Sequence, residues 1–161
     1  MNIFYLDENI KKCAQYHCDK HVVKMILESA QILCTVLHKC GMPAPYRPTH
    51  QNHPCTLWAE ASMENWLWLK LLATELNQEF QYRFDKTEPH KSFLVIEALK
   101  IPTLPMIGLT EHAQTMPVEY RVPGNAVSAY RQYYLAEKSR IPLKASLLIN
   151  FSNVIKCLII M

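Results

Sequence analysis

The longest regular pattern of apolar residues in the chain runs from Asp19 to Lys39. Apolar side chains recur there at steps of three and four residues, which is the period of one face of an α-helix. Gly41 follows directly, and glycine readily adopts the left-handed backbone conformation that ends many helices. The pattern therefore predicts a helix from about Asp19 to Lys39, with these apolar positions facing the core: Val22, Val23, Ile26, Leu27, Ala30, Leu33, Cys34 and Leu37.

A second long pattern predicts a helix from Leu57 to about Phe84, with Thr56 as its N-cap. Its tryptophans, Trp58, Trp66 and Trp68, are expected to pack in the core and not to form a base-stacking surface. Its remaining packing face consists of Ala61, Leu69, Leu72 and Leu76. The other predicted elements are a short extended segment Ile3–Leu6, a helix Glu8–Tyr16 capped by Asp7, a helix Lys91–Leu99, and a helix from Gly124-Asn125 to Arg140.

Prolines divide these helices into separate segments. Residues 42–55 contain four of them, and residues 101–123 contain Pro102, Pro105, Pro117 and Pro123. Since proline removes a backbone donor and blocks the helix interior, the first stretch is expected to be a loop and the second an irregular connection that wraps the core. The sequence thus predicts a mostly α, compact, single helical domain over residues 1–140, with long proline-rich loops.

Residues 141–161 form an apolar tail, which we expect to belong to the core or to be poorly specified. Lys144, Asn150, Asn153 and Lys156 interrupt it, so it does not contain the run of about 18 apolar residues that a membrane span needs. We therefore expect no membrane partner.

Composition supports one small helical domain. The chain has 161 residues, half of them hydrophobic, and only 3 glycines, which are few for a fold with many tight turns. Its 6 cysteines form no C-x-x-C pair, and the start of the chain does not look like a secretory signal. These features predict free thiols in the reducing cytoplasm.

Net charge changes this picture little. The formal charge is +3, and residues 100–161 carry more Lys and Arg than Asp and Glu, whereas residues 51–99 show the reverse. This asymmetry permits a polyanionic partner but does not require one.

One stripe of polar residues follows the long predicted helix, on the side opposite its apolar face. Such a stripe has two interpretations: it is the solvated side of an amphipathic helix, or it is a site with a base, an amine and a carboxylate within reach of one substrate. The spacing is four, three, four, three and four for His17, His21, Lys24, Glu28, Gln31 and Thr35.

A second group of histidines lies in the proline-rich loop directly before the next predicted helix. The N-terminal amides of a helix attract anions such as phosphate, and Tyr46 and Arg47 add stacking and positive charge. We predict that these loop residues bind substrate, together with Thr49, His50, Asn52 and His53.

A metal site is the alternative use of the same histidines. Helical histidines at i and i+4 can bind one ion, which makes a four-nitrogen set of His17, His21, His50 and His53. The H-E-x-x-H motif is absent, and neutral histidines often only form hydrogen bonds in loops.

The segment Cys18–Glu28, with Asp-Lys-His-Val-Val-Lys-Met near its start, resembles a family of short, mostly uncharacterised phage and large-virus proteins that begin Met-Asn-Ile-Phe. The spacing Asp19-x-His21 followed by Glu28 also resembles the phage-type pyrimidine-dimer DNA glycosylases, which are small all-helical enzymes. Asn52-His53-Pro54 is similar to a segment that opens a helix in bacterial members of that family. The glycosylase similarity covers about residues 10–85.

The glycosylase resemblance implies that an amine attacks sugar C1′ of a flipped or kinked damaged nucleotide in duplex DNA, without a cofactor. Glu28 would be the catalytic carboxylate. The similarity further implies that His21 and His53 position the sugar phosphate or the amine, and that Lys24 and Arg47 hold backbone phosphates.

The amine itself departs from the family pattern. The family uses the α-amine of a threonine exposed after removal of the initiator methionine, whereas position 2 here is Asn2. The resemblance therefore leaves three candidates for the amine: Met1, Lys20 and Lys24.

Three functions are compatible with these patterns and resemblances. The first is an excision enzyme acting on damaged or modified pyrimidines in DNA. The second is a metal-dependent hydrolase or nucleotide-processing enzyme that uses the histidines. The third is a non-catalytic module that binds nucleic acid.

Overall fold

The computed structural model describes residues 1–137, which form six α-helices and one short 3-10 helix. Within this range there is no β-strand, which confirms the predicted mostly α fold. The elements are α1 (Ile10–Gln15), α2 (Asp19–Lys39), α3 (Pro54–Ala61), α4 (Met63–Phe84), α5 (Lys91–Glu97), η1 (Val118–Tyr120) and α6 (Ala126–Glu137).

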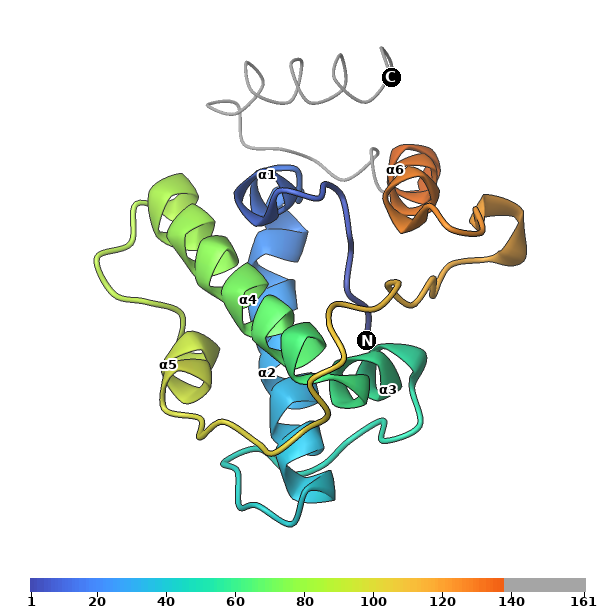
Figure 1. Cartoon of the computed structure of the whole chain (residues 1–161). Helices are drawn as coiled ribbons and strands as arrows, with labels where there is room; N and C mark the ends of the chain where they lie inside the picture. Colours follow the sequence, from blue (N-terminus) through green and yellow to red (C-terminus); the bar gives the residue numbers. More distant parts are fainter. Residues whose placement is uncertain (138–161) are drawn as a thin grey trace.

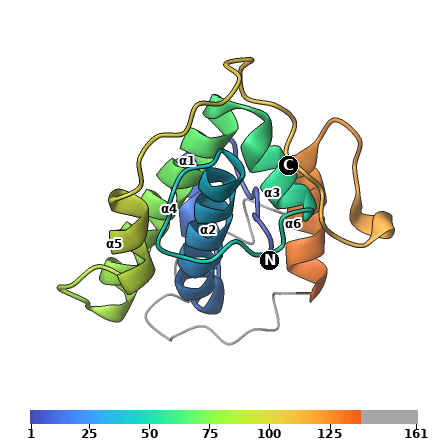
Figure 2. The same ribbon diagram turned by 90° about the horizontal axis from the view of Figure 1, so that it is seen from below.

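The two longest helices, α2 and α4, pack against each other at the centre of the fold (Figure 1). The short helices surround this pair: α1 contacts α4, whereas α3 and α5 each contact both α2 and α4. The N-terminal segment runs between α2 and α6 in both ribbon views (Figures 1 and 2). This arrangement places the start of the chain against the polar side of α2.

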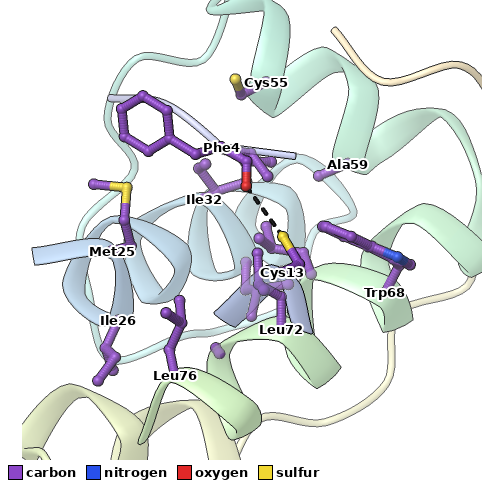
Figure 3. Packing of buried hydrophobic residues seen from close by; sticks show 14 of the residues in the cluster. Phe4, Cys13, Met25, Ile26, Ile32, Cys55, Ala59, Trp68, Leu72 and Leu76 are labelled. Atoms are coloured by element: carbon purple, nitrogen blue, oxygen red, sulfur yellow. Dashed lines mark hydrogen bonds between the residues drawn. The ribbon is translucent and has the colours of Figure 1, made fainter. Parts of the chain in front are cut away.

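The core forms where the apolar faces of α2 and α4 meet. Figure 3 shows Ile26 and Ile32 of α2 with Leu72 and Leu76 of α4, all buried. The predicted packing face of α2 is confirmed except at Val23, which is half-buried, and at Leu27, whose side chain is 39% exposed. The three tryptophans are buried, as predicted for core residues. Among the described cysteines, free thiols occur at Cys13, Cys18, Cys34, Cys40 and Cys55.

The second long helix differs from its prediction, because the chain breaks at Ser62 into α3 and α4. Ser62 has an extended backbone (φ −149°, ψ 157°), and its hydroxyl accepts a hydrogen bond of 3.1 Å from the Asn65 amide. The Met63 amide donates to the Pro105 carbonyl at 2.9 Å, so it makes no bond within a continuous helix. A contact with a distant loop thus stabilises a break that the local sequence does not reveal.

The predicted N-caps also shift by a few residues. His53, and not Thr56, caps α3, and Asn9, and not Asp7, caps α1. The Asp7 carboxylate instead accepts a hydrogen bond from the Asn9 amide at 2.9 Å, which forms a local turn before the helix. These corrections leave the predicted order of the helices up to α6 intact.

We expect Ser62→Ala to lower the free energy of unfolding by about 1 kcal/mol, because the variant loses the cap of α4. Thermal unfolding would show this as a decrease of about 3 °C in Tm. Ser62→Gly should cost at least as much, since Ser62 and Asn65 are fully buried and water cannot replace the lost bond. Equal Tm values for Ser62→Ala and the unchanged protein would contradict this role for Ser62.

The last predicted element begins as expected, since Asn125 precedes α6 and its side chain accepts from the Ser128 amide at 2.9 Å. Its predicted end at Arg140 and the apolar tail 141–161 lie outside the described residues. Within residues 1–137, no helix is both long enough and apolar enough to cross a membrane.

Candidate functional site

The first residues of the chain pack against the rest of the fold. Ile3, Phe4 and Leu6 are buried, and the Cys13 thiol donates to the Phe4 carbonyl at 3.3 Å (Figure 3). The Phe4 ring stacks on His21 of α2, with 4.6 Å between the ring centroids. Burial of these apolar side chains fixes the segment on α2 and thereby positions the residues before it.

The amino terminus lies beside the carboxylate of Glu28. The Met1 nitrogen is 4.0 Å from Glu28 Oε2, and the Asn2 amide donates to the same oxygen at 2.8 Å. On the other side, Lys24 Nζ is 3.2 Å from Glu28 Oε1. The side chains of Met1 and Glu28 are only 2% and 10% exposed, whereas that of Lys24 is 57% exposed. We call the group Met1, Asn2, Lys24 and Glu28 the amine–carboxylate site.

His53 lies near this site, at the start of α3. Its Nδ1 accepts a hydrogen bond from the Cys55 amide at 3.2 Å, so the neutral ring carries its proton on Nε2. Burial and then the positive amino terminus lower the pKa of His53, with a smaller lowering from His50, while Glu28 opposes this shift. His53 is therefore a mainly neutral donor close to the amine and the carboxylate at neutral pH.

Cys55 is the other potential nucleophile in this region. Burial raises the pKa of its thiol to about 11, although the positive amino terminus and hydrogen bonds act against that shift. A thiol with this pKa stays protonated near neutral pH, and the thiolate is the reactive form. Cys55 is therefore no nucleophile near neutral pH, and the Met1 amine becomes one once it has lost a proton.

The loop before α3 crosses the polar side of α2 beyond Glu28. The Thr49 amide donates to Thr35 Oγ1 at 3.1 Å, and the same hydroxyl lies 3.2 Å from the Thr49 carbonyl. Tyr46 is held farther away, with its hydroxyl 3.2 Å from Ser92 Oγ of α5. The remaining predicted substrate-binding residues of this loop, Arg47, His50 and Asn52, are exposed.

Most of the polar stripe of α2 is covered, because the N-terminal segment and the loop before α3 pack on it, whereas Lys24 stays exposed. His17, His21, Glu28 and Thr35 are all buried. His21 Nδ1 lies 2.7 Å from the Tyr134 hydroxyl, and His17 Nδ1 lies 2.7 Å from the Cys13 carbonyl. Two of the predicted site histidines are therefore held among aromatic and backbone groups.

The four predicted metal-binding histidines do not come together. Phe4 and Tyr134 pack on His21, while His50 and His53 lie in the loop that leads into α3. In the part of the chain that the structure describes, no group of three or more His, Cys, Asp or Glu residues is placed to hold a metal ion. The geometry of residues 1–137 thus gives no support to the metal-dependent alternative.

Sequence reasoning missed three residues that complete the surroundings of the amine. The Asn2 side-chain oxygen lies 2.5 Å from Thr115 Oγ1 and 3.0 Å from the Tyr130 hydroxyl. The two residues of each contact are far apart in the sequence, by 113 positions for Thr115 and by 128 positions for Tyr130. No local pattern could therefore indicate these contacts. They bring the irregular connection and α6 to the amine–carboxylate site.

Comparison with known proteins found no family model, no curated sequence and no solved structure that matches this chain. The resemblances to the phage proteins and to the pyrimidine-dimer glycosylases therefore stay predictions.

Proposed function

We propose that this chain is a DNA glycosylase and lyase that acts on damaged or modified pyrimidines in duplex DNA through an N-terminal amine. The observation that carries the proposal is the position of the Met1 amine, 4.0 Å from the buried carboxylate of Glu28. An amine beside a carboxylate is the pair that imine chemistry at a sugar carbon needs. The glycosylase resemblance of residues 10–85 supplies the substrate class.

In the proposed reaction, the ammonium group first gives a proton to the Glu28 carboxylate. The freed electron pair on nitrogen forms a bond to C1′, and the bond from C1′ to the base breaks, with its electrons leaving on the base. The new secondary ammonium loses one proton, and the freed electron pair opens the C1′–O4′ bond while protonated Glu28 delivers its proton to O4′, which leaves a protonated imine. Loss of a proton from C2′ then expels the 3′ phosphate and cleaves the strand.

Met1 is favoured over the two lysines as the source of the amine. Lys24 is paired with Glu28, but its side chain is 57% exposed and well solvated. Lys20 is exposed at the start of α2, eight residues from Glu28, which corresponds to about 12 Å along a helix. We assign Lys24 and the exposed Arg47 to contacts with DNA phosphates, which need charge but no reactive amine.

His53 would complete the site on the side of α3. Its Nε2 proton can be donated to a phosphate or to a sugar oxygen, since Nδ1 is occupied by the Cys55 amide. The first-turn amides of α3 present partial positive charge to the same phosphate. This assignment predicts that His53→Asn weakens DNA binding more than it slows the chemistry.

The test is to trap the imine with borohydride on duplex DNA that contains a cyclobutane pyrimidine dimer, and to map the adduct by peptide mass. We expect one DNA adduct per protein, on the peptide that begins at Met1. Intact mass before the reaction identifies the residue that carries the free α-amine. Two matched preparations test the choice of amine: protein with an acetylated N-terminus should form no adduct, and Lys24→Arg should still form one.

The outcomes separate the remaining functions. An adduct on Lys24 or Lys20 would overturn the role of the α-amine but keep the reaction class. Salt-dependent DNA binding with no adduct and no strand cleavage would indicate a binding module and reject the enzyme. Activity that a chelator abolishes, without any adduct, would restore the metal-dependent alternative.

A further inference from the structure

The side chain of Asn2 is held by two hydroxyl groups from distant parts of the chain. Thr115 Oγ1 donates to Asn2 Oδ1 at 2.5 Å, and the Tyr130 hydroxyl lies 3.0 Å from the same oxygen. Thr115 belongs to the irregular connection before η1, and Tyr130 belongs to α6. We call Asn2, Thr115 and Tyr130 the N-terminal clamp.

The hydroxyl groups of the clamp are themselves fixed. The Tyr130 ring is fully buried, and its hydroxyl lies 2.6 Å from the Ala113 carbonyl and 3.2 Å from Thr115 Oγ1. The Thr115 amide donates to the Tyr130 hydroxyl at 3.3 Å. Burial raises the pKa of Tyr130, so the phenol keeps its single proton, which the Ala113 carbonyl and Asn2 Oδ1 share. Asn2 Oδ1, an acceptor on a half-buried residue with several fixed neighbours, therefore has little freedom to move.

Asn2 is thus held through both its backbone and its side chain. Its backbone amide donates to Glu28 Oε2, while its side-chain oxygen is held by the clamp on the opposite side. The Met1 amine is attached directly to this residue through one planar peptide unit. Any rotation of Asn2 would therefore move the amine relative to Glu28.

We propose that Thr115 and Tyr130 are positioning residues that hold the α-amine of Met1 against Glu28 through Asn2. The role of the amine in this inference rests on the proposed function. Holding the amine in one orientation removes an entropic cost from the attack, and displacements of about 1 Å can slow such reactions a hundredfold. The clamp thereby gives the connection and α6 a part in the chemistry, although neither supplies a reacting group.

The experiment measures two properties of Thr115→Val, Thr115→Ser and Tyr130→Phe. The first is hydrogen-exchange protection of the Asn2 amide by NMR, which reports the bond to Glu28 without any DNA. The second is the rate of borohydride-trapped adduct formation at saturating DNA, together with DNA affinity. Thr74→Val is the matched control, because the Thr74 hydroxyl bonds to the Lys70 carbonyl of the same helix and, in the described part of the chain, to no residue of the clamp.

We expect Thr115→Val to lower both the protection of the Asn2 amide and the adduct rate by about tenfold, with unchanged DNA affinity. Thr115→Ser keeps the hydroxyl, so its amide protection and adduct rate should equal those of the unchanged protein. Tyr130→Phe should resemble Thr115→Val. Asn2→Ala removes the shared acceptor, so adding Thr115→Val to it should cause no further loss. A merely structural role would lower Tm but leave the protection and the rate unchanged in folded variants.

The two readouts keep this inference separate from the proposed function. If the unchanged protein forms no adduct, the proposed function fails, and the NMR measurement still tests the clamp. If Thr115→Val and Tyr130→Phe leave the Asn2 amide fully protected, the clamp is wrong even when the adduct forms. A further loss on combining Asn2→Ala with Thr115→Val would also overturn it.

Discussion

Glu28→Gln should reduce base release and strand cleavage by about a thousandfold, which is within the usual contribution of a general acid–base group. Glutamine has the same shape as glutamate, and its side-chain oxygen can still accept the hydrogen bond that the Asn2 amide donates. The variant cannot take up the proton that the ammonium group must lose. Single-turnover kinetics with saturating dimer-containing DNA measure the effect on the chemical step alone.

Two comparisons show whether this loss is specific. Glu60→Gln is the matched control, since Glu60 pairs with Lys39 on the surface and should leave both rates unchanged. DNA affinity should stay the same or rise slightly for Glu28→Gln, because one negative charge is removed near the phosphates. A fully active, correctly folded Glu28→Gln would remove the carboxylate from the mechanism.

The elements that the sequence predicted well are those whose signal is local. The helix Asp19–Lys39 has the predicted bounds, since its apolar period spans more than five turns and Gly41, with φ +73°, follows its end. The break at Ser62 was not predicted, because it depends on the contact between Met63 and Pro105, about forty residues away. Local patterns cannot contain that information.

The candidate site was predictable only in part. Glu28 and Met1 were both named from the sequence, but their proximity arises from packing of Phe4 on His21 and from the clamp. The same packing covers most of the polar stripe, which the sequence alone could not distinguish from a solvated face. His17 was assigned to the site from helical spacing, and His21 from spacing and from the glycosylase resemblance. The Phe4 and Tyr134 side chains that pack on both rings could not be predicted from that spacing.

Acidification should destabilise this protein strongly, because two buried histidines resist protonation. Burial lowers the pKa of His17 and of His112 from 6.5 to about 3, and the Nε2 atom of each has no hydrogen-bond partner among residues 1–137. For His17, the nearby positive charges of His21 and Arg83 add to the lowering, and the Cys13 carbonyl opposes it. His112 instead stacks between the rings of Tyr5 and Trp58.

The direction of this change in stability follows from the number of protons bound by the folded and the unfolded chain. Between pH 6.5 and about 3 the unfolded chain binds a proton at each histidine and the folded chain does not, so stability falls as the pH falls. Each histidine contributes a slope of about 1.4 kcal/mol per pH unit, so lowering the pH from 7 to 5 should cost about 4 kcal/mol in total. That loss is a large share of the usual 5–15 kcal/mol for a domain.

Urea unfolding at pH 7, 6 and 5 measures this slope, and single substitutions assign it. His112→Phe keeps the ring stack and removes the titrating group, so it should lose about half of the pH dependence. His17→Leu should lose a similar share, at a lower overall stability, because the Cys13 carbonyl then has no side-chain partner.

The exposed Gln51 provides the control, since its replacement by Ala removes no titrating group and should leave the slope unchanged. If His17→Leu and His112→Phe both kept the full slope, other groups would account for the acid sensitivity. If His17→Leu and His112→Phe instead each lose an equal share of the pH dependence, the two buried rings determine how far stability falls in acid. One ring lies beneath the N-terminal segment and the other among the tryptophans.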